Sequence, residues 1–129
     1  MKLIIFLCLT IVALVQAEGE EEREKLNEQV KKCEEELGGP KNLLEKLEKG
    51  EDIGDATKAG KMALCFNVKM GHMDADGDVV EPEFVEHVER LTSNVALRGK
   101  IVDECGKKNG ETPEIAALNF VRCMLRLVP

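Results

Sequence analysis

The sequence predicts an all-α domain of about six helices around one apolar core or cavity. Apolar residues recur at intervals of three and four along almost the whole chain, and strand patterns are nearly absent. Glycine or proline separates the periodic segments from one another. No internal repeat or low-complexity linker divides the chain, so we expect a single helical domain.

The N-terminal residues predict the cellular compartment. Lys2 precedes an apolar run from Leu3 to Val15, and Val15-Gln16-Ala17 fits a cleavage site of small residues. A membrane anchor would need about 20 apolar residues, and this run stops short at an acidic segment. We therefore expect a signal peptide over residues 1–17 and a secreted domain over residues 18–129 that has no membrane attachment after cleavage.

Two helices are expected before residue 55. The first has a narrow buried stripe whose members are spaced by three and four residues: Leu26, Val30, Cys33 and Leu37. The sequence Gly38-Gly39-Pro40 ends this helix. A shorter helix follows and stops at Gly50, with apolar residues at Leu43, Leu44 and Leu47.

The third and fourth helices are separated by a polar loop. The third runs from about Asp55 to Met70, and its apolar residues form two overlapping stripes, which predicts burial on more than one side. Gly71 and the acidic segment at 74–78 break the pattern. Pro82 is then placed as the first residue of a helix that carries Phe84, Val85, Val88 and Leu91.

Helix caps mark the last two helices. Ser93 or Asn94 is expected to cap the fifth, whose buried line is Leu97, Ile101, Val102 and Cys105, and Gly106 or Gly110 ends it. Thr112 and Pro113 open the sixth as N-cap and first helical residue. The segment from Ile115 to Leu127 is apolar around most of its circumference, so this helix is expected to be central.

The cysteines predict two disulfides. Cys8 leaves with the signal peptide, and an even number remains in a secreted chain: Cys33, Cys65, Cys105 and Cys123. A zinc site is disfavoured, because no two of them form a Cys-x-x-Cys pair and neither histidine stands at finger spacing from one. Each cysteine lies on or beside an apolar stripe, so each bridge would join two helices. Four cysteines allow three pairings, and the residues alone do not choose among them.

Charge and motif content exclude several classes of function. The formal net charge is −7 with both signs mixed along the chain, which disfavours nucleic acid and anionic membranes as partners. No nucleophile motif or phosphate loop is present, so we expect neither an enzyme nor a bound cofactor. His72 in the loop and His87 on the rim of the fourth helix are expected at the surface.

A calcium site is the alternative interpretation of the acidic loop. Asp74, Asp76 and Asp78 alternate as in the first half of an EF-hand loop. The register fails, however, because the sixth position would be Val79 instead of glycine and the twelfth would be Val85 instead of glutamate. We expect a solvated turn without a metal ion.

The cysteine order resembles that of the insect odorant-binding proteins. Cys33 is followed by 31 residues, Cys65, 39 residues, Cys105, 17 residues and Cys123. The segment from Cys65 to Asp78 also resembles that family's run after its third cysteine. The resemblance covers essentially the whole secreted domain and implies the pairs Cys33–Cys65 and Cys105–Cys123.

The sequence departs from the six-cysteine members of that family at two positions. Lys61 and Glu114 stand where those members carry their second and fifth cysteines, so the chain resembles the minus-cysteine subgroup. The missing bridge would have joined the third helix to the sixth. The opposite charges lead to the hypothesis that Lys61 and Glu114 form an ion pair that partly replaces it; the alternative is two unrelated surface charges.

The resemblance implies the transport of hydrophobic small molecules, such as odorants, pheromones or lipid-like compounds, in an internal apolar cavity. Periodicity does not distinguish a hollow interior from a filled one. The resemblance further implies delivery to a chemoreceptor, a monomer or weak homodimer, and secretion into sensillar lymph, haemolymph or gland fluid. The expected lining residues are Met62, Phe66, Met70, Phe84, Val88, Leu118, Val121 and Leu125.

Two other functions are carried as alternatives to an olfactory carrier. A haemolymph or gland protein of the same fold would act in transport or storage outside olfaction. A calcium-dependent secreted protein would need metal ligands that the acidic loop does not supply in the right register.

Overall fold

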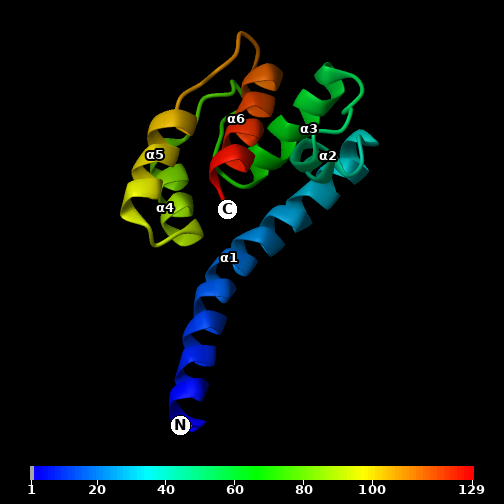
Figure 1. Cartoon of the computed structure of the whole chain (residues 1–129). Coiled ribbons are helices and arrows are strands. Elements are labelled where there is room, and N and C mark those ends of the chain that lie inside the picture. Colours follow the sequence, from blue (N-terminus) through cyan, green and yellow to red (C-terminus); the bar gives the residue numbers. More distant parts are fainter. Residues whose placement is uncertain (1) are drawn as a thin grey trace.

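The described part of the chain forms six α-helices. A computed structural model describes the backbone of residues 2–129 and the side chains of residues 19–129. The helices are α1 (Lys2–Leu37), α2 (Leu43–Lys49), α3 (Ala56–Lys69), α4 (Glu81–Leu91), α5 (Val95–Cys105) and α6 (Pro113–Leu127) (Figure 1). Over residues 2–129 the β-structure is limited to one isolated antiparallel bridge, between Met73 and Val79. The predicted all-α class is therefore confirmed.

The predicted signal peptide, residues 1–17, lies outside the residues whose side chains the structure describes. Within the described part of the chain, no helix has both the length and the hydropathy of a membrane span.

Side-chain caps set the start of three helices. Asp55 accepts hydrogen bonds from the backbone at the start of α3, Asn94 does so for α5, and Thr112 does so for α6, where Pro113 is the first helical residue as expected. One boundary differs from the prediction, because α4 begins at Glu81 and Pro82 is its second residue. Pro82 is tolerated there, because the first backbone N–H groups of a helix have no partner within the helix.

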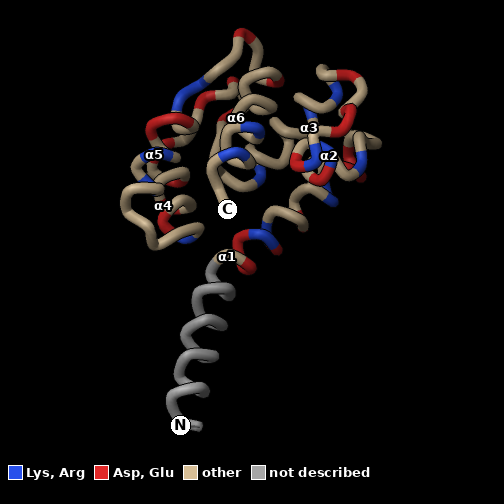
Figure 2. The backbone as a smooth tube through the Cα atoms, viewed as in Figure 1, with Lys and Arg blue, Asp and Glu red and all other residues tan. Residues whose placement is uncertain are grey.

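The core lies where α3 and α6 pack against each other. This is the most extensive helix–helix contact; α1 packs on α3 and α4, while α5 packs on α6 and α4. Figure 1 shows α6 between the α4–α5 pair and α3, which is the central place predicted for it. The buried residues of α6 include Ala116, Ala117 and Val121. Figure 2 shows charged residues on the helices as well as on the loops that connect them.

Gly60 permits the close approach of α3 to α6. A Cβ atom at this buried position would lie 2.7 Å from the carbonyl oxygen of Glu114 and 2.8 Å from its Cβ. Those distances are shorter than real contacts allow, and part of the obstacle is backbone, which cannot turn aside as a flexible side chain would. The absence of a side chain at Gly60 therefore sets the spacing between the two central helices.

The substitution Gly60→Ala tests this spacing. We expect it to lower the free energy of unfolding by about 1–3 kcal/mol, because the helices must separate to admit the methyl group. Gly99→Ala is the matched control: Gly99 is an exposed residue inside α5 with no atom within 4 Å of an added Cβ. That change should stabilise the protein by about 0.5–1 kcal/mol.

Urea denaturation of both variants measures the difference. Equal stabilisation by the two substitutions would show that α3 and α6 are not in close contact at Gly60.

Candidate ligand-binding site

Most of the predicted lining residues meet in one apolar cluster. None of the six that lie in the core is more than 5% exposed: Met62, Phe66, Phe84, Val88, Leu118 and Val121. These side chains come from α3, α4 and α6. The structure therefore brings together, against one another, residues that are far apart in the sequence.

Two of the predicted lining residues lie elsewhere. Met70 is the C-cap of α3 and is half-buried. Leu125 is half-buried, packs against the core, and lines a surface groove described below. The prediction missed Phe120, whose ring lies 5.3 Å from that of Phe84 in an edge-to-face arrangement. The prediction could have included Phe120, because α6 is apolar around most of its circumference.

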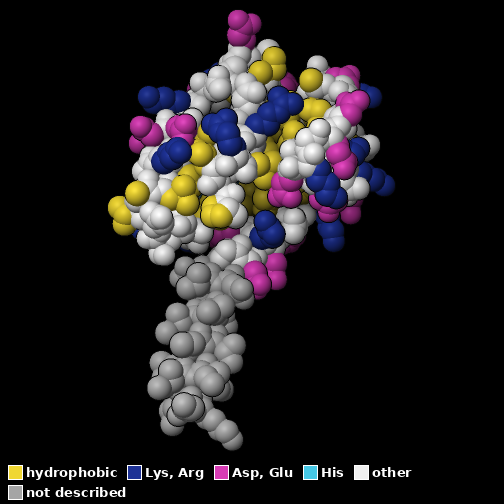
Figure 3. Space-filling model, in the orientation of Figure 1, with side chains coloured by type: hydrophobic (Ala, Val, Ile, Leu, Met, Phe, Trp, Pro, Cys, Tyr) yellow, Lys and Arg dark blue, Asp and Glu magenta, His cyan; other side chains and the backbone are white. Residues whose placement is uncertain are grey.

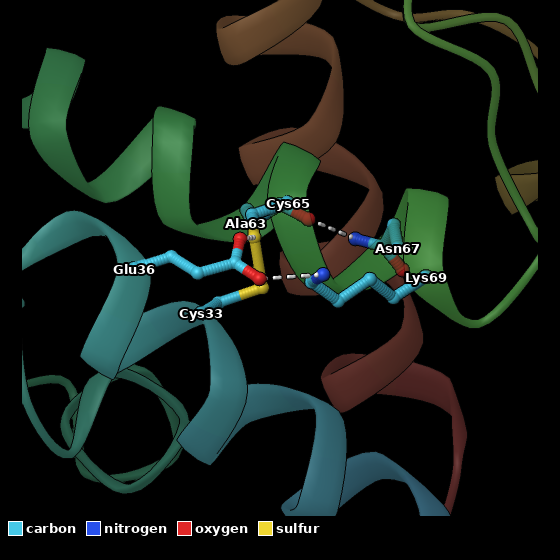
Figure 4. The surroundings of a disulfide bond; sticks show 6 residues. All are labelled: Cys33, Glu36, Ala63, Cys65, Asn67 and Lys69. Atoms are coloured by element: carbon cyan, nitrogen blue, oxygen red, sulfur yellow. Dashed lines mark hydrogen bonds and ion pairs between the residues drawn. A yellow bond between two sulfur atoms is a disulfide. The ribbon is translucent and has the colours of Figure 1, made fainter.

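The two disulfides join neighbouring helices in the pairs that the family resemblance implies. Cys33–Cys65 links α1 to α3, and Cys105–Cys123 links α5 to α6. Figure 4 shows the first bridge beside an ion pair between the same two helices, in which Lys69 Nζ lies 2.9 Å from Glu36 Oε1. The bridges therefore tie α1 to α3 and α5 to α6.

The ion-pair hypothesis for the two replaced cysteine positions does not hold in this structure. No ion pair within 4.0 Å joins Lys61 to Glu114 among the side chains described for residues 19–129. The physical reason is that Gly60, and not Lys61, faces the backbone of Glu114, while Lys61 is exposed. At this point α3 and α6 are in contact through close packing and not through an ion pair.

The acidic loop is a structured turn that positions the start of α6. The Asp74 side chain accepts hydrogen bonds from the backbone N–H groups of Asp76 and Asp78, both at 3.0 Å. Gly77 has a φ of 83°, a conformation that favours glycine. An added Cβ there would lie 2.8 Å from the Cα of Pro113, so the loop packs directly against the first residue of α6. These contacts give the Asp74 side chain a structural role, while Asp76 and Asp78 take part through their backbone N–H groups.

Both histidines are buried, so the prediction that they lie at the surface is wrong. His72 is 5% exposed and His87 is 8% exposed, and their rings lie 4.0 Å apart. The reason is a partner on α1: Glu22, which is 3% exposed, has Oε2 at 2.8 Å from Nδ1 of His87. Its other oxygen accepts a hydrogen bond from Nε of Arg90 at 2.7 Å. We call these four residues the Glu22 cluster.

The Glu22 cluster keeps its histidines neutral. Burial lowers the pKa of His72 to about 3, and the neighbouring His87 adds to the effect. Burial also lowers the pKa of His87, although the hydrogen bond and charge of Glu22 oppose the change. For Glu22, burial alone would raise the pKa, but the hydrogen bonds from His87 and Arg90 outweigh it and the pKa is lowered. At neutral pH the cluster holds one carboxylate, one guanidinium and two uncharged imidazoles.

The pH dependence of stability follows from these directions. A histidine whose pKa is lower in the folded state binds more protons when unfolded, so its contribution to stability is present above pH 6.5 and is lost as the pH falls toward 3. For His72 the free energy of unfolding should fall by up to about 1.4 kcal/mol per pH unit. Urea denaturation at pH 7, 6 and 5 measures this slope, to which the lowered pKa of His87 contributes in the same direction.

The variant His72→Gln should have a flatter pH profile over that interval, because the buried imidazole is gone. Loss of stability with an unchanged slope would mean that His72 does not resist protonation in the folded state.

Two hollows open at the surface on either side of Ile53, in the α2–α3 connection. One, of about 450 Å³, lies between α2 and α6 and is lined by Leu47, Glu48, Gly50, Glu51, Ile53, Arg122, Leu125 and Arg126. The other, of about 560 Å³, lies between the end of α1 and the start of α3 and is lined by Leu37, Gly38, Gly39, Pro40, Ile53, Gly54, Asp55, Lys58 and Lys61. Figure 3 shows apolar surface in the hollowed middle of this face, with basic side chains beside it. We call the first hollow the α2–α6 groove.

The fold and this site define a class of protein: a small helical binding domain held together by disulfides around an apolar interior. The model of the PBP/GOBP family, the pheromone-binding and general odorant-binding proteins, matches residues 15–126. The chain therefore belongs to the PBP/GOBP family, whose members are binding proteins and not enzymes.

Comparisons with individual proteins agree with the family. The chain is 28% identical over 121 residues to the B2 protein of Tenebrio molitor, covering 94% of this chain and 93% of that protein. It is equally similar to the B1 protein of the same beetle, of which it covers 92%. The structure matches that of the odorant-binding protein dmelOBP28a from Drosophila melanogaster with a TM-score of 0.65, at 20% identity over 85% of this chain and 94% of that one. This last likeness shows the fold.

Proposed function

We propose that the protein is a secreted carrier of hydrophobic small molecules, such as odorants, pheromones or lipid-like compounds. The observation that carries this proposal is family membership across nearly the whole chain. The clustering of six predicted lining residues in one apolar interior supports it. Delivery to a chemoreceptor is part of the proposal for an olfactory fluid, while the same chemistry would serve transport or storage in haemolymph or gland fluid. The tissue of expression distinguishes these roles.

Secretion is part of the same proposal. Residues 1–17 would be removed as a signal peptide, and residues 18–129 would form the circulating domain. Two disulfides support this, because such bonds persist in oxidising extracellular fluids and are rare in the cytosol. Lys61 and Glu114, at the two replaced cysteine positions, support placement in the minus-cysteine subgroup.

Binding would be driven by the transfer of apolar surface out of water. Each Å² of apolar ligand surface that is buried contributes about 25 cal/mol. The predicted lining residues pack against one another in the core, so a ligand that enters must move some of them apart. Met62 suits this role, because its thioether chain is flexible and adapts to irregular shapes. The half-buried Leu125 lies where the core meets the α2–α6 groove and is the residue that we place at the entrance.

Displacement of a neutral fluorescent naphthylamine probe tests the carrier function. We expect micromolar competition by long-chain apolar compounds against the purified, disulfide-bonded protein. Leu125→Ala should weaken probe binding several-fold, because it removes apolar contact at the entrance. Ile115→Ala is the control, since Ile115 is 48% exposed and lies at the opposite end of the same helix.

An absence of probe uptake by the unmodified protein would contradict the carrier function and favour a structural or protein-binding role. If Leu125→Ala and Ile115→Ala bind the probe with equal affinity, Leu125 does not lie at the entrance of the binding site.

A further inference from the structure

The α2–α6 groove combines an apolar surface with two basic side chains on one helix. Leu47, Ile53 and Leu125 are half-buried and pack against the core. Arg122 and Arg126 are separated by one helical turn on α6, so both project from the same side of the helix and flank Leu125 in sequence. Figure 2 shows basic positions on α6. The groove volume of about 450 Å³ is within the range of small-molecule sites.

Both arginines are available to a ligand. They are exposed, and among the side chains described for residues 19–129 neither forms an ion pair within 4.0 Å. Arg126 makes one weak side-chain hydrogen bond, in which its Nη2 lies 3.8 Å from the sulfur of Cys123. A ligand carboxylate would therefore not have to displace a protein carboxylate from either guanidinium group.

The charge around Ile53 differs from that of the chain as a whole. The chain has a formal net charge of −7, yet the two hollows that Ile53 lines contain four basic side chains: Lys58, Lys61, Arg122 and Arg126. They contain three acidic ones, and of these Asp55 is engaged in capping α3. The remaining two, Glu48 and Glu51, are on α2 and its following loop, across the groove from α6.

We propose that the α2–α6 groove binds the carboxylate of a long-chain carboxylic acid through Arg122 and Arg126. The alkyl chain would lie along Leu47, Ile53 and Leu125 toward the core. Arginine suits this role, because its planar donors hold both oxygens of a carboxylate at once. Glu48 and Glu51 would oppose an anion, but they come from a short helix and a loop, whereas the backbone positions of the two arginines lie one turn apart on the central helix. This inference rests on the proposed carrier function and narrows its ligand class.

Calorimetric titration with three ligands of equal chain length tests the inference: dodecanoate, dodecanol and dodecyltrimethylammonium. The protein should bind dodecanoate about tenfold more tightly than dodecanol, which corresponds to about 1.4 kcal/mol. In the double variant R122Q/R126Q the preference for dodecanoate over dodecanol should be lost. The matched control K107Q/K108Q removes the same charge from the α5–α6 loop and should keep the preference.

The outcomes separate this inference from the carrier function. If dodecanol binds and dodecanoate shows no preference, or if R122Q/R126Q and K107Q/K108Q behave alike, the carrier function stands and the carboxylate site is overturned. Preferential binding of dodecyltrimethylammonium would overturn the carboxylate site and would indicate that Glu48 and Glu51 bind a cationic head group instead. If none of the three ligands binds, the carrier function and the carboxylate site both fail.

Discussion

The packing of α3 against α6 is the contact on which the rest of the structure depends. The disulfides divide the fold into two covalent pairs, α1 with α3 and α5 with α6. Among the side chains described for residues 19–129, no disulfide joins one pair to the other. The pairs meet where Gly60 lies against the backbone of Glu114 and where Met62 and Phe66 enter the apolar cluster. The two disulfide-linked helix pairs are therefore held against each other by non-covalent packing. A rearrangement of the core at this interface would leave both bridges intact.

The sequence predicted the helices well, because their boundaries are set locally. Asp55, Asn94 and Thr112 cap helices with their own side chains, and Gly50 and Gly106 end helices. Such signals are found within a few residues of the boundary and need no knowledge of the fold. The pairing of the cysteines, by contrast, depended on the family resemblance and not on local chemistry.

Long-range contacts explain what the sequence could not predict. The sequence placed His87 on the rim of the fourth helix, where charged Glu86 and Arg90 stand among apolar residues, and its burial depends on Glu22, 65 positions earlier in the chain. His72 is buried against His87 for the same reason. The spacing of Lys61 and Glu114 gave no sign that Gly60 would be the point of closest approach. In the candidate site, periodicity identified most of the core, but the groove beside Ile53 arises from loops and helix ends, whose relative placement no periodic pattern specifies.

The burial of Glu22 limits how the N-terminus can be processed. If cleavage follows Ala17, only residues 18–21 precede Glu22, which is about one turn of helix. The first turn of the secreted protein would then be fixed to α4 through His87 and Arg90, with its new terminal amine close by. Trimming by a few more residues would remove the carboxylate and leave Arg90 and the two neighbouring histidines beside an unfilled space. If residues 1–17 are removed, the position of the cleavage site and the α1–α4 contact are coupled through one side chain.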